Sequence, residues 1–392
     1  MDEANAPCAA PPTGPGRPLR VALVTGSYNY IADGVALTLN RMVGYLESHG
    51  VEVLVFAPVA ARPAFSHRGE VVPVPSIAAP GRGEYRAALG LPSRPRERLL
   101  AFRPDILHIA TPDLLGHAAL ALGRKMGWPI VASYHTRYET YLTYYGLGAL
   151  TGALKGVVKR FYAGCREIFV PSESMAEALR ADGVDGEIRL WPRGIDTVRF
   201  NPGKRSEAWR AARGVAPDEV IVAFVGRLVK EKRVASVASV FARLRAEGVP
   251  HRAMFIGDGP ERTWLEREAP GAMFEGFLTG DDLPIAVASA DVFLFPSDTE
   301  TFGNVTLEAM ACALPAVCAD ATGSRSLVVA GVTGFLAPVG DDAALYKAVA
   351  TLAVDAELRR RMGEAGRTRS LEYSWDEAMG GLLARYEALA GA

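Results

Sequence analysis

The chain has 392 residues, of which 49% are hydrophobic and 22% are charged, and its formal net charge is −1. This length exceeds what one hydrophobic core usually organises, so we expect two domains. The balanced charge gives no global case for a nucleic-acid partner. The four cysteines include no CxxC pair and no Cys/His cluster, which argues against a disulfide framework.

Residues 1–18, MDEANAPCAAPPTGPGRP, are rich in Pro, Gly and Ala and carry two early acids. A signal peptide would need a basic start and a continuous apolar core, so we interpret this stretch as a disordered tail. No stretch approaches the roughly twenty apolar residues that span a bilayer. We therefore expect a cytoplasmic protein whose membrane contact, if any, is peripheral and on the inner face of the cytoplasmic membrane.

Short β-branched runs alternate with amphipathic helical stretches along the chain. The first predicted strands are 19–25, 51–57, 105–110, 129–134, 167–171 and 187–191. After a turn-rich stretch the alternation restarts, with strands at 220–226, 252–257, 273–277, 291–296, 315–319 and 334–338. Such alternation produces parallel sheets with helices on both faces. The sequence thus predicts an α/β protein with two doubly wound domains, residues 19–193 and 194–371, that face a cleft.

Open parallel sheets bind ligands beyond the carboxyl ends of their strands. Polar or glycine-rich stretches directly follow five of the predicted strands. These stretches are GSYNYIADG, HTRYET, GRLVKEKR, GDGP and SDTETFGN. We expect all five to face the cleft, where the chemistry would take place.

The stretch SDTETFGNVTLEAM (297–310) carries two glutamates separated by seven residues. We predict a helix over 303–313 whose first amides lack partners within the helix and favour an anion. These are the amides of Gly303, Asn304 and Val305. Glu300 precedes the helix and Glu308 lies inside it, so both carboxylates would flank the bound group. Carboxylates suit vicinal sugar hydroxyls. The Phe-Gly pair after Glu300 and the strand before it favour a site over the alternative of one helix-terminal and one solvated acid.

Two cations follow the 220–226 strand in VGRLVKEKR, Arg227 directly and Lys232 five residues later. Such a pair suits a diphosphate, because Arg binds it through two nitrogens and Lys acts as a point charge. The alternative is a pair of surface bases that cap carbonyls. The turn GDGP (257–260) brings backbone close to a ligand, and it is not the G-x-G-x-x-G fingerprint of dinucleotide-binding enzymes.

Two stretches of the first half carry further candidates. His135 follows a buried strand, with polar Thr136 and Arg137 behind it. A lone histidine is more often structural than catalytic, and this position leaves the two roles equally open. Asp33 and Gly34 open the first helix and could lie near phosphate or sugar, a signal that is weak by itself.

The triplet DTE (298–300) resembles an acidic metal-binding motif, but two cations and a helix N-terminus can neutralise a diphosphate, so we predict no metal. The stretch LTGALKGVVKRFYAG (150–164) reads as a basic amphipathic helix, and such helices can lie on anionic membranes. A second basic cluster comprises Arg94, Arg96, Arg98 and Arg103. We favour the alternative, a core-packed helix with a solvated basic face.

Together these motifs resemble the family-4 retaining glycosyltransferases of GT-B fold. TETFGNVTLE, preceded by DVFLFPS and followed by EAMACALPAVCA, looks like the family's E-x7-E segment. The resemblance covers nearly all of residues 19–390, because the remaining motifs occur in the family's order and spacing. They are GRLVKEKR, IGDGP, GFLTGDDL, PSESM and RGIDTVRFNP. The segments DGVALTLNRMVGYLESHG, SYHTRY and YYGLG look closest to bacterial GDP-mannose-dependent α-mannosyltransferases and to sulfoquinovosyl-transferring relatives that glycosylate lipids.

The resemblance implies a role for each candidate residue. Catalysis would involve His135 at the reacting face, Arg227 and Lys232 on the donor diphosphate, and Glu300 on the hydroxyls of the donor sugar. The remaining donor contacts would come from Gly34, Gly257, Gly259, Leu278, Phe302, Gly303, Asn304, Val305 and, on the ribose, Glu308. Candidate acceptor contacts are Tyr28, Asp33, Thr136 and Arg137. The first domain would bind the acceptor, the second the nucleotide sugar, and residues 372–392 would form a helix that packs back on the first domain.

Two segments depart from the family's pattern. Family members often have Gly-Gly where Asp33-Gly34 stand, so the aspartate would touch the acceptor or alter the donor side. Many also carry Gly-Gly and then an acid after the 315–319 strand, where this chain reads DATGSRSLV (320–328). An acid role at that place is therefore in doubt.

The predicted function is a retaining transfer of a hexose from a nucleotide diphosphate to a hydroxyl acceptor, in our interpretation a lipid or glycolipid. GDP-mannose is favoured as donor, a UDP-sugar is the alternative, and no cofactor is required. The sequence offers no convincing nucleophile from the enzyme. Retention of the anomeric configuration therefore suggests that the acceptor attacks the sugar on the face from which the phosphate leaves. A GT-B-like nucleotide-sugar epimerase and a non-catalytic nucleotide-sugar-binding protein are the rival interpretations. The missing glycine fingerprint disfavours a dehydrogenase.

Overall fold

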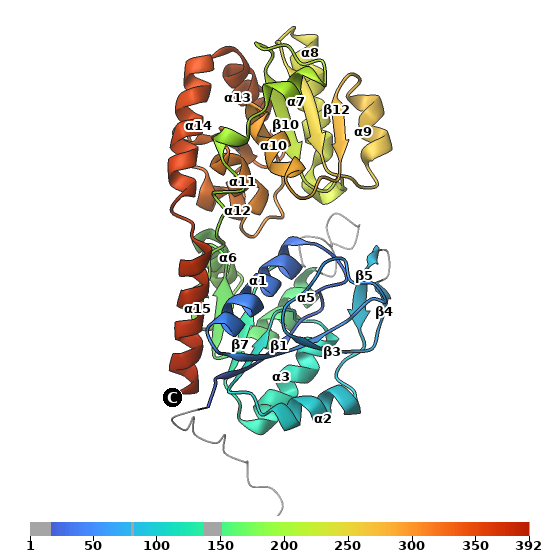
Figure 1. Ribbon diagram of the computed structural model, residues 1–392, viewed down its shortest axis with the longest axis vertical. Coiled ribbons are helices and arrows are strands. Elements are labelled where there is room, and N and C mark those ends of the chain that lie inside the picture. Colours follow the sequence, from blue (N-terminus) through green and yellow to red (C-terminus); the bar gives the residue numbers. More distant parts are fainter. Residues whose placement is uncertain (1–16, 80–81, 137–150, 392) are drawn as a thin grey trace, which may run out of the picture. The chain divides into compact units, whose positions relative to one another are not determined.

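The computed structural model describes residues 17–79, 82–136 and 151–391. The chain divides into two compact units, each built around a parallel sheet (Figure 1). The first unit contains the described residues of 1–135, 149–191 and 376–392, and the second those of 136–148 and 192–375.

The first unit holds a seven-stranded sheet of order β3-β2-β1-β6-β7-β8-β9, in which neighbouring strands run parallel. The strands are β1 (Arg20–Val24), β2 (Glu52–Ala57), β3 (Glu70–Pro73), β6 (Ile106–Ile109), β7 (Ile130–Ser133), β8 (Glu167–Val170) and β9 (Ile188–Leu190). Its helices are α1 (Gly34–Ser48), α2 (Ser93–Phe102), α3 (Leu114–Met126), α5 (Thr151–Tyr162), α6 (Glu173–Ala181) and α15 (Trp375–Ala390). Every residue of β6, β7 and β8 is buried, as expected for strands that helices cover on both faces.

The second unit holds a six-stranded parallel sheet of order β12-β11-β10-β13-β14-β15. The strands are β10 (Ile221–Val225), β11 (Arg252–Ile256), β12 (Met273–Gly276), β13 (Val292–Phe295), β14 (Ala316–Ala319) and β15 (Gly334–Ala337). The α-helices are α7 (Glu207–Ala211), α8 (Val234–Ala246), α9 (Arg262–Glu268), α10 (Asp282–Ala288), α11 (Asn304–Ala311), α12 (Thr322–Leu327), α13 (Asp342–Val354) and α14 (Ala356–Ser370). The described part of this unit also contains the short 3-10 helices η2 (Pro202–Lys204) and η3 (Lys230–Lys232).

All twelve predicted strands form, each within one residue of its predicted ends. The sequence analysis missed β3 and a separate antiparallel pair, β4 (Ser76–Ala79) and β5 (Arg82–Ala88). In β3 every residue is partly or fully exposed, so no buried apolar run marks this edge strand. Most of the described side chains of the pair β4–β5 are likewise partly or fully exposed.

The basic helix α5 is packed on one side and solvated on the other. Val158 and Phe161 are buried in the core of the first unit, whereas Val157 is 44% exposed. Lys155 Nζ donates to Asp182 Oδ1 at 2.6 Å. This arrangement fits the core-packed interpretation. Within the described parts of the chain, no helix is both long enough and apolar enough to cross a membrane.

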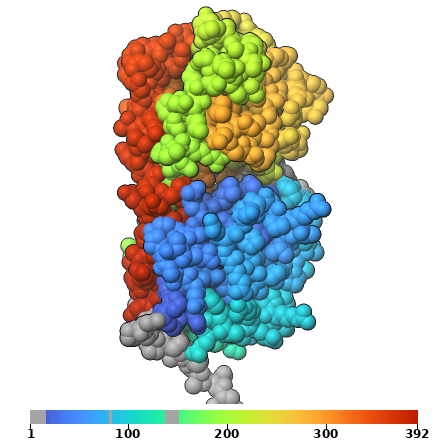
Figure 2. Space-filling view, viewed as in Figure 1, coloured from blue at the N-terminus to red at the C-terminus, as the bar shows by residue number. Residues whose placement is uncertain are grey.

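The final helix α15 belongs to the first unit and lies along its surface (Figure 1; Figure 2). Tyr386 on this helix is fully buried, and its hydroxyl hydrogen-bonds Nδ1 of His108 in β6. The other ring nitrogen of His108 lies 2.6 Å from Ser133 Oγ in β7. Arg385 adds an ion pair to the buried carboxylate of Glu167 in β8. Three strands and the helix are thus joined by buried or partly buried polar contacts.

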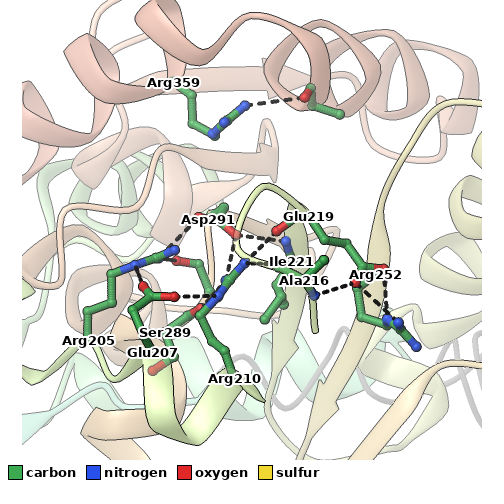
Figure 3. Close-up of polar contacts among 12 residues, drawn as sticks. Arg205, Glu207, Arg210, Ala216, Glu219, Ile221, Arg252, Ser289, Asp291 and Arg359 are labelled. Atoms are coloured by element: carbon green, nitrogen blue, oxygen red, sulfur yellow. Dashed lines mark hydrogen bonds and ion pairs between the residues drawn. The ribbon is translucent and has the colours of Figure 1, made fainter. Parts of the chain in front are cut away.

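A buried arginine organises the amino ends of β10 and β13 (Figure 3). Arg210 is 1% exposed; its Nη1 donates to Ser289 O at 2.8 Å and to Asp291 Oδ2 at 3.0 Å, and its Nη2 donates to Glu219 O. The same Asp291 oxygen accepts the Ile221 amide at 2.8 Å. Because each contact replaces a hydrogen bond to water, the charge is tolerated inside the unit. This network lies at the end of the sheet opposite the predicted chemistry.

Candidate active site

The loops that follow β10 and β11 pack backbone against backbone. Leu228 N donates to Asp258 O at 2.9 Å, and Glu261 N donates to Leu228 O at 3.0 Å. Gly257 has φ 135°, and a Cβ on it would lie 2.0 Å from the carbonyl oxygen of Gly226. A Cβ on Gly259 would lie 2.4 Å from Leu228 O. Both glycines of GDGP are therefore needed for the contact between these two loops.

Lys232 ends the 3-10 helix η3 in the loop after β10, and its ammonium group forms an ion pair with Glu300 in the loop after β13. Each of the two side chains is only 18% exposed. Ser297 Oγ donates to the same Glu300 oxygen at 3.4 Å, and Lys232 Nζ lies 5.9 Å from the centre of the Phe295 ring. Arg227, the other predicted phosphate ligand, follows β10 directly and is partly buried. The cation and the glutamate, which the sequence predicted in two loops at the same edge of the sheet, are thus in contact.

Helix α11 begins at Asn304, and Gly303 is its N-cap residue with φ 98°. This positive φ is available to glycine at little cost, and Gly303 brings no side chain to cap the helix. The amides of the first turn, which include those of Asn304 and Val305, therefore point out of the helix without an intrahelical acceptor. Phe302 is buried and packs edge-on against the Tyr373 ring, with centroids 5.8 Å apart. The helix is shorter than the predicted 303–313, because Cys312 ends it as the C-cap.

Glu308 lies one turn inside α11, in a different environment from Glu300. It is partly buried, and desolvation raises the pKa of its carboxyl to about 7, an effect that nearby Arg199 opposes. Arg199 Nη2 also donates to Gly280 O at 3.0 Å. This bond links the surroundings of Glu308 to the loop after β12 that contains the partly buried Leu278. A ligand that donates hydrogen bonds to such a desolvated carboxyl would stabilise its charged form.

Several polar residues around Glu300 were not among the predicted donor or acceptor contacts. Ser297 and Thr299 are buried, with their hydroxyls 3.3 Å apart, and Thr299 Oγ1 donates to Glu231 O at 3.3 Å. Arg233 has φ 52° and its Nη1 lies 3.7 Å from Asp298 Oδ2. The only signal in the sequence is the density of short hydroxyl side chains directly after a strand, which is also common in ordinary turns.

The acidic triplet 298–300 is engaged in these ion pairs. Asp298 contacts Arg233 and Glu300 contacts Lys232, while Thr299 bonds to a main-chain carbonyl. Among the described residues, no three His, Cys, Asp or Glu side chains are grouped so that they could hold a metal ion.

Comparison with known proteins identifies the family. One model, described as Glycosyltransferase Family 4, matches residues 32–199, and another, described as Glycosyl transferases group 1, matches residues 205–369. A GDP-mannose-dependent alpha-mannosyltransferase of Mycolicibacterium smegmatis is 37% identical over 382 residues, which are 95% of this chain and 98% of the relative. The chain belongs to the family 4/group 1 glycosyltransferases.

Other relatives agree on the family and on the fold. A GDP-mannose-dependent alpha-mannosyltransferase of Corynebacterium glutamicum is 33% identical over 94% of this glycosyltransferase and 89% of the relative. The sulfoquinovosyl transferase SQD2 of Arabidopsis thaliana is 33% identical over 92% of this chain and 72% of its own. The structure of a sucrose-phosphate synthase from Thermosynechococcus elongatus superposes with a TM-score of 0.77 at 21% identity, covering 95% of this chain and 99% of that one. These findings confirm the predicted α/β GT-B fold.

The candidate residues of the first predicted domain, residues 19–193, lie at different depths. His135 is 9% exposed, with its ring edge-on to Trp191 at a centroid distance of 5.8 Å. Gly34 is exposed at the start of α1, where the Asp33 side chain caps the helix by accepting the Ala36 amide at 2.8 Å. Thr136 is partly buried. Arg137 lies outside the described residues.

Tyr28 is fully buried in the structure of this glycosyltransferase. Its hydroxyl donates to Arg68 O at 2.6 Å, and burial raises the pKa of this phenol well above its usual value. The predicted contact between Tyr28 and an acceptor would therefore require the surrounding residues to move. Asp33 is only partly buried, and its carboxylate already caps α1.

Proposed function

We propose that this glycosyltransferase moves a hexose from a nucleoside diphosphate to a hydroxyl acceptor with retention of the anomeric configuration. The observation that carries the proposal is the Lys232–Glu300 pair. It lies at the carboxyl end of the second sheet, beside the uncapped start of α11. A cation for phosphate and a carboxylate for sugar hydroxyls thus stand together where open parallel sheets bind ligands.

The donor is proposed to bind through the second unit. Lys232 and the partly buried Arg227 hold the diphosphate, and the first-turn amides of α11 add partial positive charge without a cation. Glu308 accepts hydrogen bonds from the ribose, and Glu300 accepts them from the hexose. Gly257, Gly259 and the backbone near Leu278 shape the nucleotide pocket.

The transfer step needs no protein nucleophile in this proposal. The bond between C1 of the sugar and the phosphate oxygen breaks, and the acceptor oxygen forms its bond to C1 on the same face. The acceptor proton passes to the departing phosphate, whose charge Arg227 and Lys232 stabilise. His135 orients the sugar or stabilises the positive charge that develops on it.

GDP-mannose is the proposed donor and a lipid or glycolipid the proposed acceptor. Three relatives at 33–37% identity are named GDP-mannose-dependent alpha-mannosyltransferases. A UDP-sugar is the competing donor, since a structure of the same fold, Anabaena HepE at 19% identity and a TM-score of 0.73, is described in complex with UDP-glucose. A lipid acceptor would bring the protein to the inner face of the cytoplasmic membrane.

A thermal-shift panel of GDP- and UDP-sugars tests the donor. A ligand that binds only the folded state stabilises it by mass action, by about 2.7 kcal/mol at a concentration one hundred times its Kd. We expect GDP-mannose to raise Tm most, and Lys232→Met to abolish most of this rise. If a UDP-sugar raises Tm more than GDP-mannose does, the donor is that UDP-sugar. If Tm rises with none of the nucleotide sugars, the proposed function is contradicted.

A further inference from the structure

The main-chain carbonyl of Glu300 is held from the opposite side to its carboxylate. Thr322 Oγ1 donates to Glu300 O at 2.7 Å, and the Gly323 amide donates to the same oxygen at 3.0 Å. Both donors come from the first turn of α12, which follows β14. Two hydrogen bonds therefore join the start of α12 to the loop after β13.

The contact between these two segments is too close for a side chain at position 323. A Cβ on Gly323 would lie 2.6 Å from the Glu300 Cβ and 2.9 Å from Phe302 O. Gly323 is buried, and the N-cap residue Ala321 brings no side-chain hydrogen bond to α12. The first turn of this helix thus packs directly on the backbone of residues 300–302. Movement of the Glu300 backbone away from Lys232 would have to break this contact.

The two ends of Glu300 are consequently fixed by different elements. Its carboxylate meets Lys232 from the β10 loop, and its carbonyl meets Thr322 from α12. Amide donors are available from any residue, whereas the hydroxyl donor depends on the identity of residue 322. Thr322 is therefore the part of this contact that a conservative substitution can remove without changing the backbone.

We propose that Thr322 is a positioning residue for sugar transfer: its hydroxyl fixes the backbone of Glu300, so that the Glu300 carboxylate meets the hexose of the bound donor in one orientation. The inference rests on the proposed function, because it assigns the hexose to Glu300. Thr322 acts through Glu300 and need not touch the donor.

Substitution of the hydroxyl separates this role from general stability. Thr322→Val keeps the shape and removes the donor, and a neutral hydrogen bond of this kind is worth roughly a three- to tenfold change. We expect Thr322→Val to lower kcat for hexose transfer from GDP-mannose by that factor, with the affinity for free GDP changed less than twofold. Thr322→Ser should retain wild-type kcat. Ser326→Ala removes a hydroxyl from the same helix, where Oγ donates to Thr322 O at 3.5 Å, and should leave kcat unchanged.

A double-mutant cycle decides whether Thr322 acts through Glu300. GDP-mannose affinity and residual transfer are measured for wild type, Thr322→Val, Glu300→Gln and the double variant, all at a temperature where each is folded. We expect the effect of Thr322→Val to shrink to less than twofold in the Glu300→Gln background. An undiminished effect there, or equal losses in GDP and GDP-mannose affinity, would overturn the positioning role and leave the proposed function standing. Absence of nucleotide-sugar binding by the wild type would overturn both.

Discussion

Glu300→Gln should bind free GDP more tightly than the wild type while it loses transfer activity. In the structure the Glu300 carboxylate forms an ion pair with the ammonium group of Lys232. The proposed mechanism assigns this ammonium group to the diphosphate. A diphosphate that arrives without a sugar must compete with this carboxylate. An intact donor compensates for the lost ion pair, because its hexose hydroxyls donate new hydrogen bonds to the Glu300 carboxylate. The substitution keeps the size of the side chain and removes only the competing charge.

The size of the gain follows from the exposure of the pair. Two unit charges about 4 Å apart interact by about 4 kcal/mol at an effective dielectric constant of about 20, whereas solvent-exposed pairs are worth about 0–1 kcal/mol. The Lys232 and Glu300 side chains are each 18% exposed, so we place the pair between these limits, at about 1–2 kcal/mol. The expected gain in GDP affinity is therefore roughly five- to thirtyfold.

Isothermal titration calorimetry with GDP measures this gain, and Asp298→Asn is the matched control. Asp298 lies in the same loop and has the same charge, but its carboxylate lies 3.7 Å from Arg233 Nη1. We expect Asp298→Asn to change GDP affinity less than threefold. Transfer by Glu300→Gln should fall roughly 10²-fold, as for the loss of one transition-state contact. Unchanged GDP affinity, or an equal gain in both variants, would refute the competition.

Lys232→Met should weaken GDP-mannose binding at least about tenfold, since it removes a charged phosphate contact; calorimetry showing unchanged affinity would contradict that role. Glu308→Gln should stabilise the protein at pH 8 but not at pH 4.5, by about 1–3 kcal/mol. Burial raises the pKa of Glu308 from 4.5 to about 7, so the folded state binds the extra proton and stability falls as pH rises through this window. A Tm difference between Glu308→Gln and the wild type that does not change with pH would argue against the raised pKa of Glu308. Arg210→Met should cost roughly 3–5 kcal/mol in urea unfolding, because Asp291 loses a buried partner; a cost below about 1 kcal/mol would show that the network is dispensable. Tyr386→Phe should cost about 1 kcal/mol through the lost His108 hydrogen bond, and an unchanged midpoint would remove its role in anchoring α15.

The fold was predictable because parallel strands bury both faces. A run such as Val292–Phe295 is apolar at every position, so it can be recognised without knowledge of the neighbouring strands. Strand β3 sits at a sheet edge and carries no such run, so its pairing with β2 depends on tertiary contacts. The pair β4–β5 escaped for the same reason.

The candidate site was predictable as a set of positions. Residues that directly follow strands of one parallel sheet gather at the same edge, so the loops of Lys232 and Glu300 could be expected at one edge. Their pairing with each other, and the contact between Thr322 and the Glu300 carbonyl, join segments 68 and 22 residues apart and have no periodic signature. The raised pKa of Glu308 also depends on burial that helix periodicity does not reveal.

The central claim is hexosyl transfer with retention, and NMR of the product tests it directly. GDP-mannose labelled at C1 is incubated with the protein and a polar lipid extract, and the labelled anomeric carbon is followed together with release of GDP. We predict an α-linked mannoside formed in step with GDP by the wild type and virtually none by Glu300→Ala. A β-linked product, or conversion of the donor to another nucleotide sugar without an acceptor, would contradict the account.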